Sequence, residues 1–290
     1  MTAVPVPLQR PGASSAVAIV PEPSTDSPHS APKMKTSGVA PLEDITAEAR
    51  RLLDAATAVQ VTLRLLGGLA VAFRVPQGTS PLFSRAYRDI DFMAPKGTSR
   101  RQIAALLVDA GYTPHEQFNA INGHRRLIFH DPPNQRQIDI FIGAFAMCHE
   151  IPIGERLALE PDTIPLAELL LTKLQVVQIN DKDLSDILAL IYHNRLGDDD
   201  GREIINMRRI AALCAAEWGL WRTVTANLER ADAALSHPGL AVADTDRQVL
   251  AHRLHSLRAR VDAEPKSRKW KLRARVGDRV RWYEDVEEVG

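Results

Sequence analysis

In Arg88-Asp89-Ile90-Asp91-Phe92, acidic and apolar side chains alternate from Asp89 onward. Successive side chains of a strand point to opposite faces, so this alternation predicts Asp89 and Asp91 on one face and the apolar residues in the core. A second run, Gln137-Ile138-Asp139-Ile140-Phe141, places Asp139 between isoleucines in the same way. Three carboxylates on one face of a small sheet repel one another unless cations neutralise them. Hard oxygen ligands of this kind select Mg²⁺ or Mn²⁺, so the pattern predicts a metal site suited to phosphate chemistry.

A glycine pair precedes the acidic strand, in the run Leu65-Leu66-Gly67-Gly68-Leu69-Ala70, which reads as a strand that turns into a helix. Together with the Asp-x-Asp strand and the third Asp, this order resembles the nucleotidyltransferase superfamily, and within it the AbiEii-type toxin family. Lys173, among helical leucines, and Asp186, further along the chain, match later positions of that family. The resemblance spans residues 45–195, about half of the chain.

The resemblance implies a metal-dependent nucleotidyltransferase that moves a nucleoside monophosphate from an NTP onto a hydroxyl and releases pyrophosphate. It assigns the catalytic and nucleotide-binding site to Asp89, Asp91, Asp139, Lys173, Gly67, Gly68 and Asp186. In this assignment the first three ligate two ions about 3.5–4 Å apart. The glycines let backbone amides approach the β and γ phosphates, and Lys173 stabilises charge on the leaving group. Asp186 takes the family's last acidic position, beside the nucleotide.

The acceptor stays open between RNA or tRNA, a protein hydroxyl and a small molecule. The resemblance also implies a toxin-like role in a toxin–antitoxin or phage-defence pair, with a cognate antitoxin protein as partner. An alternative hypothesis is a catalytically degenerate nucleotidyltransferase-fold module that binds nucleotide or RNA without turnover. Leu69 motivates it, because the family has a hydroxyl residue there, and so does the long segment before Asp89. A purely structural helical protein is the third hypothesis.

The composition limits the partners and the cellular compartment that we expect for the protein. The 290 residues contain 36 basic and 36 acidic side chains, so no global charge field recruits nucleic acid, and any polyanion contact must be local. Cys148 and Cys214 are predicted to be buried free thiols in a reducing compartment. No apolar run approaches the roughly 18 residues of a membrane span, and no secretion signal is evident. A cytoplasmic protein without membrane contact is expected.

The sequence predicts an α/β (α+β) fold: a small mixed sheet followed by helices. Residues 1–40 are rich in Pro, Ser, Ala and Thr and are predicted to be disordered. Residues 41–160 are expected to form the nucleotidyltransferase core, including a helix capped at Thr98 or Ser99 and paired strands around residues 126–142. Residues 161–263 are expected to form a helical domain, with one helix over residues 201–218. Residues 264–290 form a basic and then acidic segment, predicted to include a short strand around Trp282.

Several charged groups have a structural interpretation beside a functional one. The run Asp198-Asp199-Asp200 is attributed to helix capping and solvation and not to metal chelation. Arg85 and Arg88 either balance the acidic strand or contact the nucleotide. The basic residues of 266–281, with Trp270 and Trp282 nearby, either clamp phosphates and stack bases or form a solvated tail.

Overall fold

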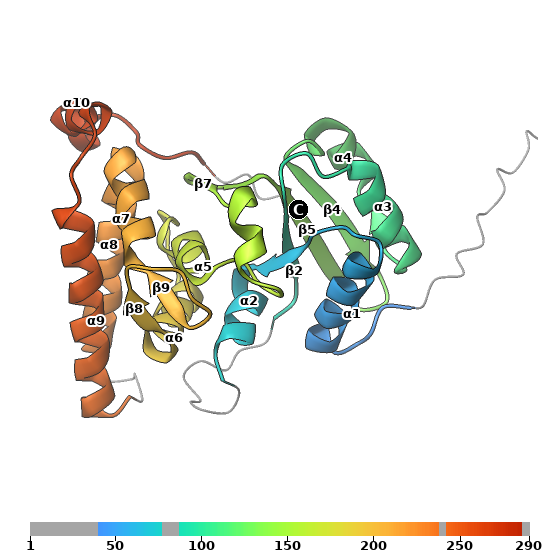
Figure 1. Cartoon of the computed structure of the whole chain (residues 1–290), viewed down its shortest axis with the longest axis horizontal. Helices are drawn as coiled ribbons and strands as arrows, with labels where there is room; N and C mark the ends of the chain where they lie inside the picture. Colours follow the sequence, from blue (N-terminus) through green and yellow to red (C-terminus); the bar gives the residue numbers. More distant parts are fainter. Residues whose placement is uncertain (1–39, 77–86, 238–241, 286–290) are drawn as a thin grey trace, which may run out of the picture. The chain divides into compact units, whose positions relative to one another are not determined.

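A five-stranded mixed sheet forms the centre of the N-terminal half of the computed structural model (Figure 1). The structure describes residues 40–76, 87–237 and 242–285. The segment predicted to be disordered therefore lies outside the described residues, apart from its last position. The strand order is β1-β2-β5-β4-β3. The strands are β1 (Arg64–Leu66), β2 (Ile90–Ala94), β3 (Thr113–Pro114), β4 (Arg126–Asp131) and β5 (Arg136–Ile142).

Strands β2 and β5 are parallel, whereas the β1–β2, β4–β5 and β3–β4 pairs are antiparallel. Two further pairs of short strands lie outside this sheet: β6 (Ala144–Ala146) with β7 (Glu150–Pro152), and β8 (Arg195–Gly197) with β9 (Ile204–Asn206). The predicted mixed α/β class and the strand pair around residues 126–142 are confirmed.

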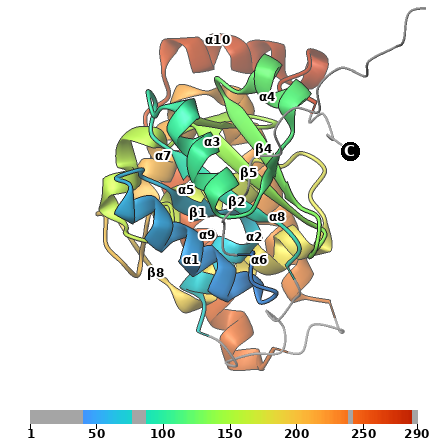
Figure 2. The same ribbon diagram turned by 90° about the vertical axis from the view of Figure 1, so that its right-hand side faces the viewer.

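Helices lie on both sides of the sheet, with α1 and α3 on one side and α5 and the later helices on the other (Figures 1 and 2). The α-helices are α1 (Ile45–Ala58), α2 (Gly67–Arg74), α3 (Arg100–Asp109), α4 (Glu116–Asn122), α5 (Leu166–Leu174), α6 (Asp181–His193), α7 (Met207–Ala216), α8 (Trp218–Leu235), α9 (Asp244–Ala263) and α10 (Arg268–Val276). Two 3-10 helices are η2 (Gly154–Leu159) and η3 (Gly277–Arg279).

Local sequence explains where several helices begin. The side chain of Asp44 accepts a hydrogen bond from the Ala47 amide at the start of α1, and Ser99 caps α3 in the same way, as predicted. Asn180 caps α6 and Ser267 caps α10. These caps satisfy amides that have no partner inside their own helix.

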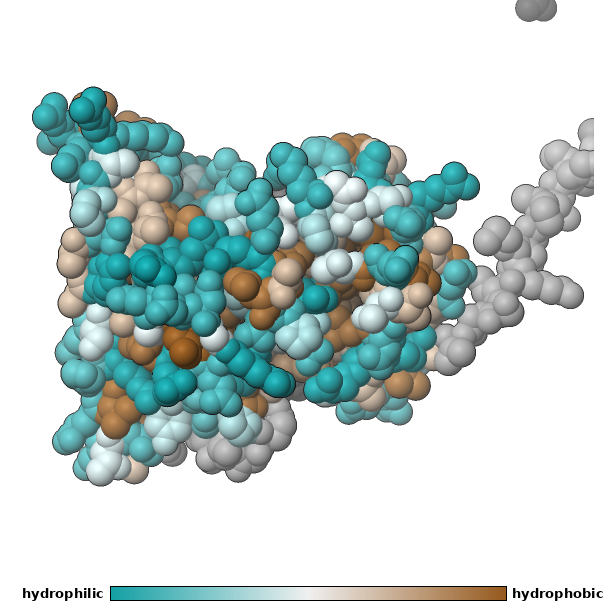
Figure 3. Space-filling model, viewed as in Figure 1, coloured by the Kyte–Doolittle hydropathy of each residue, from teal (hydrophilic) through white to brown (hydrophobic). Residues whose placement is uncertain are grey.

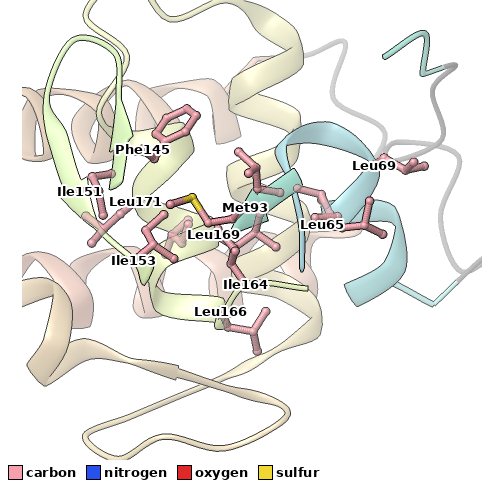
Figure 4. Close-up of a cluster of buried hydrophobic side chains, with 14 of the residues drawn as sticks. Leu65, Leu69, Met93, Phe145, Ile151, Ile153, Ile164, Leu166, Leu169 and Leu171 are labelled. Atoms are coloured by element: carbon pink, nitrogen blue, oxygen red, sulfur yellow. The ribbon is translucent and has the colours of Figure 1, made fainter. Parts of the chain in front are cut away.

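The alternation along β2 decides what faces the C-terminal helices. Ile90 and Phe92 are fully buried on one face, as predicted. Met93 lies on the other face and packs in a buried cluster with Leu169 and Leu171 of α5 (Figure 4). Because side chains two apart share a face, Asp91 points to the same side of the sheet as Met93. The packing of α5 against Met93 therefore brings the helix that carries Lys173 close to the acidic strand.

Two predictions about the second half of the chain are wrong. Residues 204–206 form β9, not helix, because they pair with β8, and α7 begins only at Met207. The acidic run Asp198-Asp199-Asp200 lies between β8 and β9 instead of capping a helix, and its carboxylates pair with Arg260, Arg208 and Arg156.

The strand expected around Trp282 is absent from the described residues 280–285, and the basic segment before them forms α10 and η3. Within the described ranges, no helix combines the length and the apolarity that a bilayer span requires. The domain boundaries near residues 160 and 263 stay predictions.

Candidate functional site

Two of the predicted carboxylates lie side by side on adjacent strands. The parallel register of β2 and β5 pairs Asp91 with Asp139, so both side chains share a face of the sheet. Asp89 lies just before β2 and is exposed, and its carboxylate accepts a hydrogen bond from the Gln137 amide of β5. All three candidates from the sequence therefore gather around one pair of strands, although Asp89 precedes the strand that was predicted to contain it.

The clustering of the three carboxylates has its largest effect on the pKa of Asp91. Burial and repulsion from Asp139 raise the pKa of Asp91 to about 7, with a further contribution from Asp89 and opposing contributions from Lys173 and Arg126. Burial also raises the pKa of Asp89, to which the charge of Asp139 adds. Asp91 and Asp89 are therefore both easier to protonate than an isolated aspartate in water.

Asp139 is engaged by two side chains. Arg126 Nε lies 2.9 Å from its Oδ1, and Gln137 Nε2 lies 2.9 Å from its Oδ2. Within the described ranges, no three carboxylate, imidazole or thiol side chains converge on one point in a way that would hold an ion. Both oxygens of Asp139 are therefore hydrogen-bonded to neighbouring side chains.

Gly67 allows the glycine turn to lie directly against Asp91. Leu66 pairs with Asp91 across β1 and β2, and α2 begins at the next residue. Gly67 has a φ of +71°, and a Cβ atom at this position would overlap Oδ2 of Asp91. Both the backbone conformation and the space therefore require glycine. The turn places the amino-terminal, electropositive end of α2 at Asp91, where anions bind favourably.

Lys173 of α5 completes the polar side of the site. Its Nζ lies 3.1 Å from Oδ1 of Asp183 and 2.9 Å from Oδ2 of Asp186. Burial alone would lower the pKa of Lys173, but the two carboxylates raise it above its ordinary value, so the side chain stays an ammonium ion. Asp186 is 3% exposed and reaches the site through Lys173.

A cavity of about 510 Å³ brings most of these groups together. Its polar wall includes Gly67, Gly68, Asp91, Asp139 and Lys173. Apolar side chains, among them Phe141, Phe145 and Val176, also line the cavity, as is common in small-molecule sites, and its size suits a nucleotide. Asp89 and Asp186 are not part of this wall.

Several pocket residues escaped the sequence predictions. Asp183, three residues before Asp186 and passed over in favour of it by the resemblance, lines the cavity, and Arg126 lines it beside Asp139. Arg126 had a usable signal: β4 and β5 pair with Ile128 opposite Asp139, so Arg126 is the diagonal neighbour of that carboxylate on the same face. The C-terminal residues Tyr283–Asp285 also line the cavity, and no local pattern indicates it.

The two cysteines are free and buried, as predicted. Cys148 lies on the wall of the cavity. Cys214 is a buried residue of α7, and burial raises the pKa of its thiol to about 12. Arg85 lies outside the described residues, and the exposed Arg88 lowers the pKa of Asp89 slightly against the effect of burial.

No family profile matches the sequence, and no curated protein is significantly similar to it. Among solved structures, the chain is similar to the solution structure of the antibiotic-resistance factor ANT(2'')-Ia. The two are 12% identical with a TM-score of 0.34, and the match covers 79% of this chain and 95% of that one. A likeness this distant does not bear on the chemistry of the site, so the function proposed below rests on the residues of the cavity.

Proposed function

We propose that this chain is a metal-dependent nucleotidyltransferase that moves a nucleoside monophosphate from an NTP onto a hydroxyl and releases pyrophosphate. The observation that carries the proposal is the packing of Gly67 against Asp91. It joins the electropositive start of a helix to a carboxylate pair, Asp91 and Asp139, on parallel strands. Lys173 lies on the wall of the same cavity, so groups for phosphate and for a cation occur together.

A divalent cation fits the chemistry of this group of carboxylates. Burial and like-charge repulsion raise the pKa of Asp91 to about 7, and a bound cation would remove that cost. Asp89 and Asp91 would hold it, with Asp139 beside them. Bound there, such a cation would supply charge stabilisation at the transferring phosphoryl group and activation of the acceptor hydroxyl.

The residues of the chain have separate roles in this proposal. The first amides of α2, at Gly67 and Gly68, bind phosphate oxygens through the helix end. The ammonium group of Lys173 stabilises the charge that develops on pyrophosphate, and Asp186 orients that ammonium group from behind. Arg126 holds Asp139 in place. The apolar side chains that line the cavity shelter the base from water.

The acceptor is a hydroxyl of RNA or tRNA, of a protein or of a small molecule. Exposed cations on α10 favour a polyanion: Arg268, Lys271 and Arg275 project into solvent, and none forms an ion pair with the described residues. Figure 3 shows this end of the molecule as strongly hydrophilic. A toxin-like role with an antitoxin partner follows from the resemblance in sequence, and growth arrest on expression of the chain would test it.

A nucleotide-binding module without turnover is the second candidate. The hydrogen bonds of Arg126 and Gln137 to both oxygens of Asp139 favour it, because they leave that carboxylate less able to ligate an ion. Leu69 also stands where a hydroxyl would contact phosphate, and it is buried instead. A module of this kind binds NTP but yields no pyrophosphate.

The test is incubation with α-labelled NTPs, Mn²⁺ and total tRNA, with the protein itself and small-molecule hydroxyls as further acceptors. Label transfer that is lost in Asp91→Asn and kept in Asp54→Asn supports the enzyme. Asp54 is an exposed residue of α1 outside the cavity and serves as the matched control. Nucleotide binding without transfer or pyrophosphate release would contradict it and favour the module.

A further inference from the structure

The C-terminal end of the described chain lies on the wall of the nucleotide cavity. We call Trp282–Asp285 the C-terminal strap. It follows α10 and η3 and runs back toward β7 (Figure 1). Tyr283, Glu284 and Asp285 of the strap line the same cavity as Asp91 and Lys173. Residues almost two hundred positions apart in the sequence thus share one wall.

Specific contacts hold the strap in place. Nε1 of Trp282 donates a hydrogen bond to Oγ1 of Thr223 over 3.0 Å, and the indole packs edge-on against Trp218 of α8. The amide of Glu284 donates to the carbonyl of Cys148 over 3.1 Å. Gly219 leaves room for the strap, because a Cβ there would lie 2.5 Å from the Trp282 carbonyl oxygen. The strap is therefore seated in a matching site on α8 and on the loop before β7.

The strap adds negative charge to a wall that is already acidic. The rest of the wall has three carboxylates, Asp91, Asp139 and Asp183, against two cations, Lys173 and Arg126. The strap contributes Glu284 and Asp285. Arg281 pairs with Asp285, whereas the exposed Glu284 side chain forms no ion pair with the described residues. A triphosphate that enters the cavity meets this additional repulsion at short range.

We propose that the C-terminal strap is an autoinhibitory wall of the nucleotide cavity: its carboxylates oppose the triphosphate, and the strap must be displaced or neutralised for full binding. This inference rests on the proposed function, because it takes an NTP as the ligand. One indole hydrogen bond, one backbone hydrogen bond and the packing of Trp282 against Trp218 and Arg222 hold a segment that bears the same charge as the ligand. These properties are consistent with a strap that is displaced from the cavity when a nucleotide binds.

Neutralisation of the strap tests its charge. We expect Glu284→Gln/Asp285→Asn to bind a fluorescent ATP analogue with Mn²⁺ roughly 5- to 10-fold more tightly than the unmodified chain at low salt. The difference should shrink at about 1 M salt, where exposed charges are screened. The control, Glu116→Gln/Asp54→Asn, removes one Glu and one Asp from exposed positions outside the cavity and should leave the affinity unchanged.

The outcomes separate this inference from the proposed function. Equal affinity of the strap variant and the unmodified chain overturns the inference alone. Weaker binding by the strap variant also overturns it, since Glu284 or Asp285 would then help to hold the metal or the nucleotide. Absence of nucleotide binding by every variant overturns the proposed function and the inference with it.

Loosening the anchor tests displacement. Trp282→Phe keeps an aromatic ring but removes the hydrogen bond to Thr223. Cys148, 7% exposed on the cavity wall, reports opening through its rate of alkylation, while the fully buried Cys214 serves as the unreactive thiol. We expect alkylation of Cys148 to become roughly tenfold faster in Trp282→Phe. The same rate in both proteins would show that the strap does not cover the cavity, and would contradict the proposal.

Discussion

Glu48 and Asp91 are both carboxylates held within the α/β half of the molecule, but the fold treats them in opposite ways. Glu48 is fully buried, and Arg51 donates two hydrogen bonds to it, over 2.8 and 2.6 Å. Tyr112 donates a third over 2.6 Å. Burial alone would raise the pKa of Glu48, but these hydrogen bonds bring it below the ordinary value. Burial and Asp139 instead raise the pKa of Asp91 to about 7.

The opposite pKa shifts show that partners inside the fold stabilise the charge on Glu48, whereas the fold alone destabilises the charge on Asp91. The lowered pKa of Glu48 stabilises the fold above its unfolded pKa, and this stability is lost as the pH falls through the folded pKa. The raised pKa of Asp91 acts in the opposite direction: from about pH 4 to about pH 7 the unfolded chain binds fewer protons than the folded one. Deprotonation of Asp91 therefore destabilises the fold as the pH rises, unless a cation binds.

Replacement of Asp91 should have the largest effect. We expect Asp91→Asn to reduce kcat/KM for nucleotidyl transfer by roughly 10³-fold or more, because it removes a group that acts on the transferring phosphate. At pH 8 without metal, the same change should raise the free energy of unfolding by about 1–3 kcal/mol, since it relieves like-charge repulsion. Label transfer and urea denaturation measure the two effects.

The exposed Asp54 provides the control for this substitution. Asp54→Asn should change neither transfer nor stability by more than about 0.5 kcal/mol. Loss of stability at pH 8 in Asp91→Asn would contradict the comparison, because Asp91 would then be a satisfied structural group like Glu48.

Glu48→Gln should have the next largest effect, and in the opposite sense on stability. We expect it to lower the free energy of unfolding by about 3 kcal/mol at pH 7, because it leaves the Arg51 charge without its partner inside the fold. Urea denaturation at pH 7 and pH 3 checks the size and the pH dependence, which should weaken at low pH. Transfer per folded molecule should be retained. A variant as stable as the unmodified chain at pH 7 would show that the pair does not stabilise the fold.

Gly67→Ala tests the close contact between the glycine turn and Asp91, and Gly97→Ala is its control. Both glycines have positive φ, +71° and +88°, so each substitution costs about 1 kcal/mol of backbone strain. Only at Gly67 would the added Cβ meet Asp91, and nothing lies within 4 Å of a Cβ at Gly97. We expect Gly67→Ala to be about 1–2 kcal/mol less stable than Gly97→Ala and to lose nucleotide affinity. Thermal unfolding and nucleotide titration measure both, and equal behaviour would rule out the close contact.

Local patterns were enough to predict much of the fold around Asp91. The period-two alternation identified β2 and β5, and a capping residue and a helical stripe identified α3. The run up to Gly67-Gly68 placed the turn that meets Asp91. These features depend on residues close together in the sequence.

The remaining features depend on tertiary contacts. Residues 204–206 became a strand only because β8 offered a partner, and their sequence also suits a helix. The hydrogen bond between Trp282 and Thr223 holds the strap beside the cavity, and no periodic pattern in the sequence predicts that these two residues pair. Asp183 and Asp186 both pair with Lys173, but of the two only Asp183 lines the cavity, and this difference is set by how α6 packs against α5.

The central claim is that Asp91 helps to bind a divalent cation. Titration calorimetry of Mn²⁺ binding to the unmodified chain and to Asp91→Asn, at pH 6 and pH 8, tests it most directly. The pKa of about 7 predicts that Asp91 releases a proton on binding at pH 6 and that affinity rises roughly tenfold by pH 8. Asp91→Asn should bind at least tenfold more weakly at pH 8, with little pH dependence. Equal Mn²⁺ affinity in the two proteins, or affinity independent of pH in the unmodified chain, would contradict the account.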